Sequence, residues 1–161
     1  MQNPEPQSEH RWLQRLVGEW TMEAEFTMAP DQPPTKTTGA ENVRSLGGLW
    51  TVGEMEGGMA GGDTDRSIMT LSYDPSKQRF VGTFVASCMT HLWVYSGSLD
   101  SSGKFLTLDT EGPSFSGDGT LAKYQDIIEF LSEDHRTLSS QFLGADGEWQ
   151  RFMTAHYRRK A

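Results

Sequence analysis

Apolar and polar residues alternate along most of the chain with a period of two, which is typical of half-buried β-strands. In "WTMEAEF", Trp20, Met22, Ala24 and Phe26 alternate with polar residues, and stretches such as "LGG", "DPSKQ" and "GADG" indicate turns between such runs. Strands are expected at 20–27, 37–46, 49–56, 67–73, 79–86, 90–99, 104–111, 121–131, 136–143 and 148–158. About ten short strands in series predict an antiparallel all-β fold, either a sandwich or an up-and-down barrel. A single barrel is favoured because closure leaves no exposed edge strand.

A different pattern precedes the first strand. Apolar residues between Trp12 and Val17 recur at helical spacing and predict a helix over 8–17, with Ser8 as its N-cap. This helix is short and has one apolar face, so it must pack against another part of the protein.

The lengths of the connections predict which end of the barrel is open. If the strands alternate in direction, four short connections share one end of the barrel, at 45–48, 74–78, 100–103 and 132–135. The connections at 29–37, 57–65 and 112–119 then share the other end, and they are longer. We therefore expect a closed bottom, plugged by the N-terminal helix, and an open mouth, over which the Gly-rich loop 57–65 could act as a lid.

Length and charge limit the functional classes. The chain has 161 residues, enough for one domain, which we place at 8–161 after a flexible segment 1–7. Its net charge of −8 disfavours nucleic acids and anionic membranes as partners. The chain has one cysteine, so an internal disulfide is excluded. The N-terminal residues do not resemble a signal peptide, and a cytoplasmic location is expected.

The start of the first strand carries a recognisable motif. "LVGEWTMEAEF" resembles the Gly-x-Trp start of lipocalin-like, or calycin, barrels, with Gly18 and Trp20 in the motif positions. The resemblance implies that Trp20 seals the closed end and that a basic residue of the last strand, Arg158 or Arg159, packs across it. From about residue 9 onward, "SLGGLW", "MTLSYDPSKQRFVGTF", "MTHLWVYSG" and "MTAHYRRK" are similar to a bacterial lipocalin-like family named only as a domain of unknown function.

The stretch "SCMTHLWVYSG" suggests a binding surface. His91, Trp93 and Tyr95 share one face of the expected strand, while Leu92 and Val94 form the face that resembles core. If the first face points inward, these three side chains line the lumen. The alternative is that Trp93 and Tyr95 only pack in the core and His91 is bonded to a loop.

The residues expected at the mouth, because they lie at strand ends there, are Glu54, Glu56, His91, Asp109, Glu111 and Tyr124. The candidate ligand-binding residues are Trp50, Glu54, Glu56, His91, Trp93, Tyr95 and Tyr124. The aromatic side chains would supply contact area, and Glu54, Glu56 and His91 would orient a polar or cationic group. His91 with two carboxylates could also ligate a divalent metal, although strand-end carboxylates are commonly solvated.

Three functions follow from these patterns. The leading hypothesis is the binding of a small, partly apolar molecule in the lumen. The second, implied by the resemblance to lipocalin-like barrels, is an isomerase, cyclase or hydratase that uses His91 and a mouth carboxylate. The third is a filled barrel that pairs as a homodimer. No catalytic residue, metal or cofactor is assigned.

The remaining histidines and the cysteine carry weaker expectations. Haem ligation by His156 is disfavoured, because this residue alternates out of the apparent inward set. His10 and His135 are expected to face solvent, and Cys88 to be a small packed residue.

Overall fold

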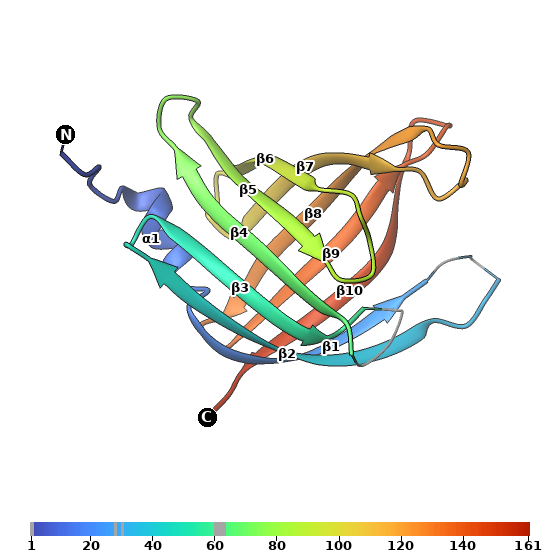
Figure 1. The fold of residues 1–161 in the computed structure, drawn as a ribbon, viewed down its shortest axis with the longest axis horizontal. Helices are drawn as coiled ribbons and strands as arrows, with labels where there is room; N and C mark the ends of the chain where they lie inside the picture. Colours follow the sequence, from blue (N-terminus) through green and yellow to red (C-terminus); the bar gives the residue numbers. More distant parts are fainter. Residues whose placement is uncertain (1, 28, 30, 60–63) are drawn as a thin grey trace.

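The computed structural model describes residues 2–27, 29, 31–59 and 64–161. Within these residues the chain forms one short helix and ten strands, and the strands close into an antiparallel barrel (Figure 1). In chain order these are α1 (Ser8–Gln14), β1 (Gly18–Phe26), β2 (Thr35–Leu46), β3 (Trp50–Gly57), β4 (Arg66–Asp74), β5 (Arg79–Ala86), β6 (Trp93–Leu99), β7 (Phe105–Pro113), β8 (Leu121–Ser132), β9 (His135–Leu143) and β10 (Trp149–Arg159). Each strand pairs with the next, and β1 pairs with β10 to complete the circle. The predicted up-and-down barrel is therefore confirmed.

The alternation of residues sets the inner and outer faces. In β1, Trp20, Met22 and Ala24 are buried inside, while their polar neighbours face solvent. The prediction for the strand after His91 was wrong on one face, because Leu92 and Val94 point outward and are 54% and 58% exposed. A barrel wall buries only its inner face against the lumen, so apolar residues on its outer face have no second layer to cover them.

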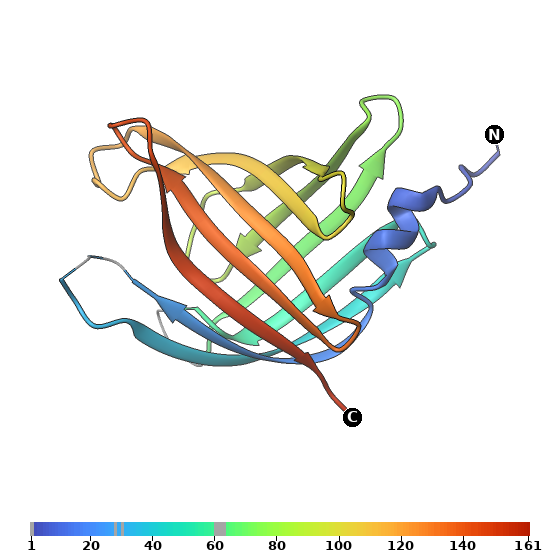
Figure 2. The ribbon, with the colours of Figure 1, turned by 180° about the vertical axis from the view of Figure 1, so that it is seen from behind.

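The helix α1 closes one end of the barrel (Figures 1 and 2). Trp12 packs edge-on against Phe130 with ring centroids 5.3 Å apart. Its indole N–H donates a hydrogen bond of 2.7 Å to the carbonyl of Gly103, in the β6–β7 turn. The apolar face of the helix is thus buried at the end that carries the short turns, as the sequence predicted.

His10 differs from its expected solvent-facing position. The side chain is only 3% exposed, and its Nε2–H donates to the carbonyl of Tyr73 at 2.9 Å. Its Nδ1 accepts a hydrogen bond from the backbone N–H of Gln7, which occupies the N-cap position that was predicted for Ser8. Nε2 of His10 therefore ties the helix to the barrel, while Nδ1 caps the helix N-terminus.

Trp20 lies at the same closed end and is fully buried. The Arg159 guanidinium lies 4.2 Å from the Trp20 ring centroid and donates to the carbonyl of Val17 at 2.8 Å. Gly18 has a φ of +139°, and a Cβ there would collide with the Arg159 guanidinium. The structure thus assigns the basic partner of Trp20 to Arg159, whereas Arg158 is exposed beside His135.

Among the described residues, α1 is the sole helix, and it lacks the length and apolar character of a membrane span.

Candidate functional site

Between the helical plug and the mouth, the barrel encloses a cavity of about 490 Å³. Ligand pockets of small molecules commonly occupy roughly 300–1,000 Å³. Among the described residues, six methionines line the cavity: Met22, Met55, Met59, Met69, Met89 and Met153. Methionine side chains are unbranched and adaptable, so such walls accommodate apolar groups of varied shape. A barrel packed solid with side chains would not leave this volume.

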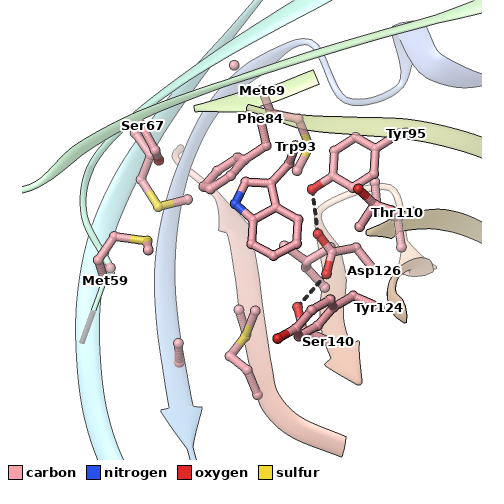
Figure 3. Close-up of a pocket in the computed structure, with 18 of the residues that line it drawn as sticks. Met59, Ser67, Met69, Phe84, Trp93, Tyr95, Thr110, Tyr124, Asp126 and Ser140 are labelled. Atoms are coloured by element: carbon pink, nitrogen blue, oxygen red, sulfur yellow. Dashed lines mark hydrogen bonds between the residues drawn. The ribbon is translucent and has the colours of Figure 1, made fainter. Parts of the chain in front are cut away.

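His91, Trp93 and Tyr95 all face this cavity (Figure 3 shows Trp93 and Tyr95). Trp93 packs edge-on against Tyr124, with ring centroids 5.1 Å apart, and its indole N–H points to the sulfur of Met89 at 3.1 Å. The unusual face of "HLWVY" thus forms part of the cavity wall. Of the residues predicted at the site, His91, Trp93, Tyr95 and Tyr124 are brought together here.

Gly112 determines where the Trp93 ring can lie. A Cβ at this position would collide with the six-membered ring of the Trp93 indole. Gly112 lies within β7, where glycine commonly marks the close approach of another group. Gly112 was not predicted as a site residue, although a glycine inside a strand pattern is a signal of such a close approach.

Further aromatic side chains gather at the mouth. Phe115, in the β7–β8 loop, has its ring centroid 5.0 Å from that of Phe152 and 5.8 Å from that of Tyr124. All three side chains line the cavity, and Phe115 remains 52% exposed. Phe115 and Phe152 were not predicted as site residues. Phe115 stands in a Gly- and Ser-rich loop that carries no strand periodicity, so its inward position had no sequence signal.

The cavity also contains a carboxylate that sequence analysis did not predict. Asp126, on β8, accepts hydrogen bonds from the Tyr95 hydroxyl at 2.5 Å and from the Ser140 hydroxyl at 2.6 Å (Figure 3). Burial raises the pKa of Asp126 above its usual value, although both hydrogen bonds act in the opposite direction. Burial and the nearby Asp126 raise the pKa of Tyr95 well above 10, so its hydroxyl remains a hydrogen-bond donor.

Two more charged residues reach the lumen nearer the closed end. Arg136 and Glu41 form a buried ion pair, with side chains that are only 4% and 10% exposed. The Arg136 guanidinium also lies 3.9 Å from the ring centroid of Tyr157 and 4.5 Å from that of Trp20. This pair joins the floor of the cavity to the sealed end and is neutral overall.

Trp50, Glu54 and Glu56 lie elsewhere than predicted. In β3 the inward positions are held by Thr51, Gly53 and Met55, so the three predicted residues point outward. Glu54 pairs with Arg44, and Glu56 with Arg66 at 2.8 Å, on the exposed surface. The expectation that these side chains line the lumen is corrected, because Trp50 starts the strand on the outward alternation and every second residue follows it.

His91 is not joined by a mouth carboxylate. Its Nε2–H donates to the backbone carbonyl of Glu111 at 2.9 Å, and the Glu111 side chain is exposed. Asp109 pairs with Arg79 at 3.2 Å on the outer face. Among the described residues, no three His, Cys, Asp or Glu side chains group so that they could hold a metal ion. The acid–base pair and the metal site expected around His91 are therefore not assembled in this part of the chain.

Two other chemical groups lie outside the lumen. His156 is exposed and hydrogen-bonded to His135 at 2.9 Å, so it could not ligate a haem inside the barrel. Cys88 is exposed, whereas it had been expected to be packed.

The loop 57–65, expected as a lid, lies partly outside the described residues, but Gly58 and Met59 border the cavity.

Residues 5–159 match a protein family described as "Protein of unknown function (DUF1579)". This chain belongs to that family. DUF1579 accordingly covers the helix and all ten strands described above. No curated protein matches this DUF1579 chain.

Solved structures with similar folds are distant in sequence. The crystal structure of Rv2717c from M. tuberculosis matches 98% of this DUF1579 chain and 100% of its own, with 14% identity and a TM-score of 0.59. A redesigned β-barrel, b11L5F_LGL, covers 94% of this chain and 96% of its own, at 13% identity and a TM-score of 0.49. EF1p2_mFAP2b bound to DFHBI covers 95% and 100%, at 15% identity and a TM-score of 0.45. At this level of identity, the similarity to Rv2717c shows a shared barrel fold.

Proposed function

We propose that this protein is a lipocalin-like binding protein that holds one small, largely apolar molecule in the barrel lumen. The observation that carries the proposal is the cavity of about 490 Å³, walled by methionine and aromatic side chains. The acidic net charge of −8 supports a small molecule, rather than a nucleic acid or an anionic membrane, as the partner.

The affinity follows from the apolar area that a ligand would bury. Contact over about 200 Å² of apolar surface contributes about 5 kcal/mol before ordering costs. The cavity is already formed between rigid strands, so little protein ordering opposes binding. A gain of about 5 kcal/mol corresponds to a dissociation constant of about 0.2 mM, so micromolar affinity without covalent chemistry requires about 330 Å² of buried apolar surface.

A neutral apolar dye such as Nile red provides a direct test. The dye should bind with a rise in fluorescence, and Ser67→Phe should weaken its binding at least about tenfold, because Ser67 is buried and faces the cavity. Ile68→Phe is the matched control, since Ile68 is the next residue on the same strand and is 40% exposed. Equal dye affinity in both variants, with both still folded by thermal unfolding, would place the dye on the outer surface and refute the proposal.

Native mass spectrometry of the gently purified protein would complement the dye. A retained extra mass that is lost on denaturation would identify the class of the ligand. The same mass retained by Ile68→Phe and lost from Ser67→Phe would locate it in the lumen.

A further inference from the structure

Among the described residues that line the cavity, Asp126 is the one carboxylate that has no charged partner. Glu41, the other lining carboxylate, is paired with Arg136. Of the ion pairs found among the described residues, none includes Asp126. A carboxylate inside an apolar cavity is costly unless a cation compensates it or a proton neutralises it.

The hydrogen bonds of Asp126 leave acceptor capacity on the lumen side. Each carboxylate oxygen accepts one hydrogen bond, Oδ2 from Tyr95 and Oδ1 from Ser140. An ionised carboxylate offers about four acceptor positions, so about two remain. The side chain lines the cavity, and its accessible surface therefore faces the lumen.

A second polar group on this wall lacks a partner. The Thr110 hydroxyl is buried, and it makes no hydrogen bond to any described residue. Thr110 is 8% exposed and lines the cavity, and Figure 3 shows it on the same wall as Tyr95 and Asp126. A buried hydroxyl without a partner costs about 1–3 kcal/mol, so a ligand group that reaches it would relieve that cost.

The neighbouring side chains suit a cation. Tyr124 and Trp93 present aromatic rings on the same side of the cavity (Figure 3). Aromatic faces attract ammonium groups, and the attraction grows when the cation is removed from water. A carboxylate, a free hydroxyl and aromatic rings together form a surface that an ammonium group can satisfy with its N–H donors and its charge.

The geometry points to a ligand that carries a protonated amine on an apolar body, with Asp126 as its counter-ion and Thr110 as a second hydrogen-bond partner. This inference rests on the proposed function and specifies its ligand class. The ammonium would donate to the free positions of Asp126 and to the Thr110 oxygen, while the apolar body would lie against the methionine-rich wall.

Three probes of equal chain length test this inference: decylammonium, 1-decanol and decanoate, each measured by displacement of Nile red. Decylammonium should bind at least about tenfold more tightly than 1-decanol, and decanoate should bind most weakly. In Asp126→Asn the preference for decylammonium should fall to within about threefold, while the affinity for 1-decanol stays unchanged. Asp109→Asn is the control, because Asp109 is a carboxylate on the outer face, and it should retain the full preference.

A pH series on the unaltered protein keeps the test decisive if Asp126→Asn fails to fold. The titratable groups that interact with Asp126 from other strands are Tyr95 of β6 and Tyr157 of β10. Among the described residues outside β8, the other titratable or charged ones that line the same cavity are His91 and the neutral pair of Arg136 from β9 with Glu41 from β2. Burial raises the pKa of both tyrosines, so neither becomes charged at neutral pH. Decylammonium should therefore lose affinity as the pH falls through the pKa of Asp126, and 1-decanol should not.

The outcomes separate the two proposals. Equal affinity for decylammonium and 1-decanol, or a preference for decanoate, would refute Asp126 as a counter-ion and leave lumen binding intact. A preference that survives in Asp126→Asn would also refute it. If Nile red and all three probes fail to bind, both the inference and the proposed function are wrong.

Discussion

Two tryptophans mark the two ends of this barrel, and their surroundings differ. Trp20 is fully buried, its N–H donates to the carbonyl of Leu16 at 2.8 Å, and two guanidinium groups lie over its ring. Trp93 is half-buried, borders an open cavity and donates only to a methionine sulfur. The same residue type therefore completes the packing at one end and leaves a surface available at the other.

The contrast indicates that the closed end of the barrel contributes mainly to stability and the open end mainly to binding. At the closed end, the Arg159 guanidinium over Trp20 donates to the carbonyls of Arg15 and Val17 and so ties the last strand to the chain between the helix and β1. At the open end, Tyr124 contacts both Trp93 and Phe115 edge-on, beside space that a ligand could fill. We expect substitutions at the first end to reduce stability and substitutions at the second to change binding.

The largest expected loss of stability comes from a substitution at the closed end. Trp20→Ala should lower the free energy of unfolding by about 3–5 kcal/mol, as the loss of buried tryptophans does. Trp93→Ala should cost about 1–2 kcal/mol, because this side chain already borders a cavity. Urea denaturation of both variants measures the difference, and equal losses would remove the distinction between the two ends.

Gly112 offers a test of how tightly the open end holds Trp93. Gly112→Ala should cost about 1–3 kcal/mol, because the new Cβ must displace the indole ring. In a Trp93→Ala background the same substitution should cost much less, so the two changes should couple in a double-mutant cycle. Additive losses would mean that Gly112 is required for the backbone of β7 rather than for the position of Trp93.

Two carboxylates at the open end should respond to pH in opposite directions. Burial raises the pKa of Asp126, so the folded state holds this proton more tightly and stability falls as the pH rises through that pKa. Hydrogen bonds from Thr120 lower the pKa of Asp118 to about 2, so its contribution is present above the unfolded pKa and is lost as the pH falls toward 2.

The corresponding asparagine variants separate these effects. Relative to the unaltered protein, Asp126→Asn should gain stability as the pH rises from 4 to 7, and Asp118→Asn should lose stability as the pH rises from 2 to 4. Urea midpoints across the pH range measure both slopes. Slopes of the same sign would show that Asp126 is not disfavoured as an anion in the folded lumen.

The smallest expected effect on stability concerns His91 at the rim. His91→Ala removes one hydrogen bond to the Glu111 carbonyl, which should cost no more than about 1 kcal/mol. Nile red binding should weaken a few-fold, because the ring also packs 4.7 Å from the Trp93 centroid. A large drop in the thermal midpoint would instead make His91 a structural residue.

Much of the fold was predictable from local patterns. The regular alternation in β1, the short turns at one end and the apolar face of the helix each depend on neighbours in sequence, so they specify strands, direction and the closed end. The burial of Trp20 followed from the same logic and from the motif around Gly18. His10 was misjudged because its two hydrogen-bond partners, the Gln7 N–H and the Tyr73 carbonyl, are backbone groups that a residue pattern does not reveal.

The polar centre of the cavity depended on three-dimensional structure. Asp126 lies between Tyr124 and Ile128 on the inward alternation of β8, but a residue pattern does not show that Tyr95 of β6 and Ser140 of β9 meet it there. In β3 the pattern itself was ambiguous, because the inward positions include Thr51 and Gly53 while Trp50 lies outside.

The sequence by itself determined the strands, their order, the closed end and the face that carries His91, Trp93 and Tyr95, because each of these depends on periodicity and turn chemistry within a few residues. Only the tertiary structure decided that Asp126 meets Tyr95 and Ser140, that Glu41 pairs with Arg136, and that Glu54 and Glu56 face solvent. Closing a sheet into a barrel brings together residues from strands far apart in the chain, and it selects one face of every strand for the lumen.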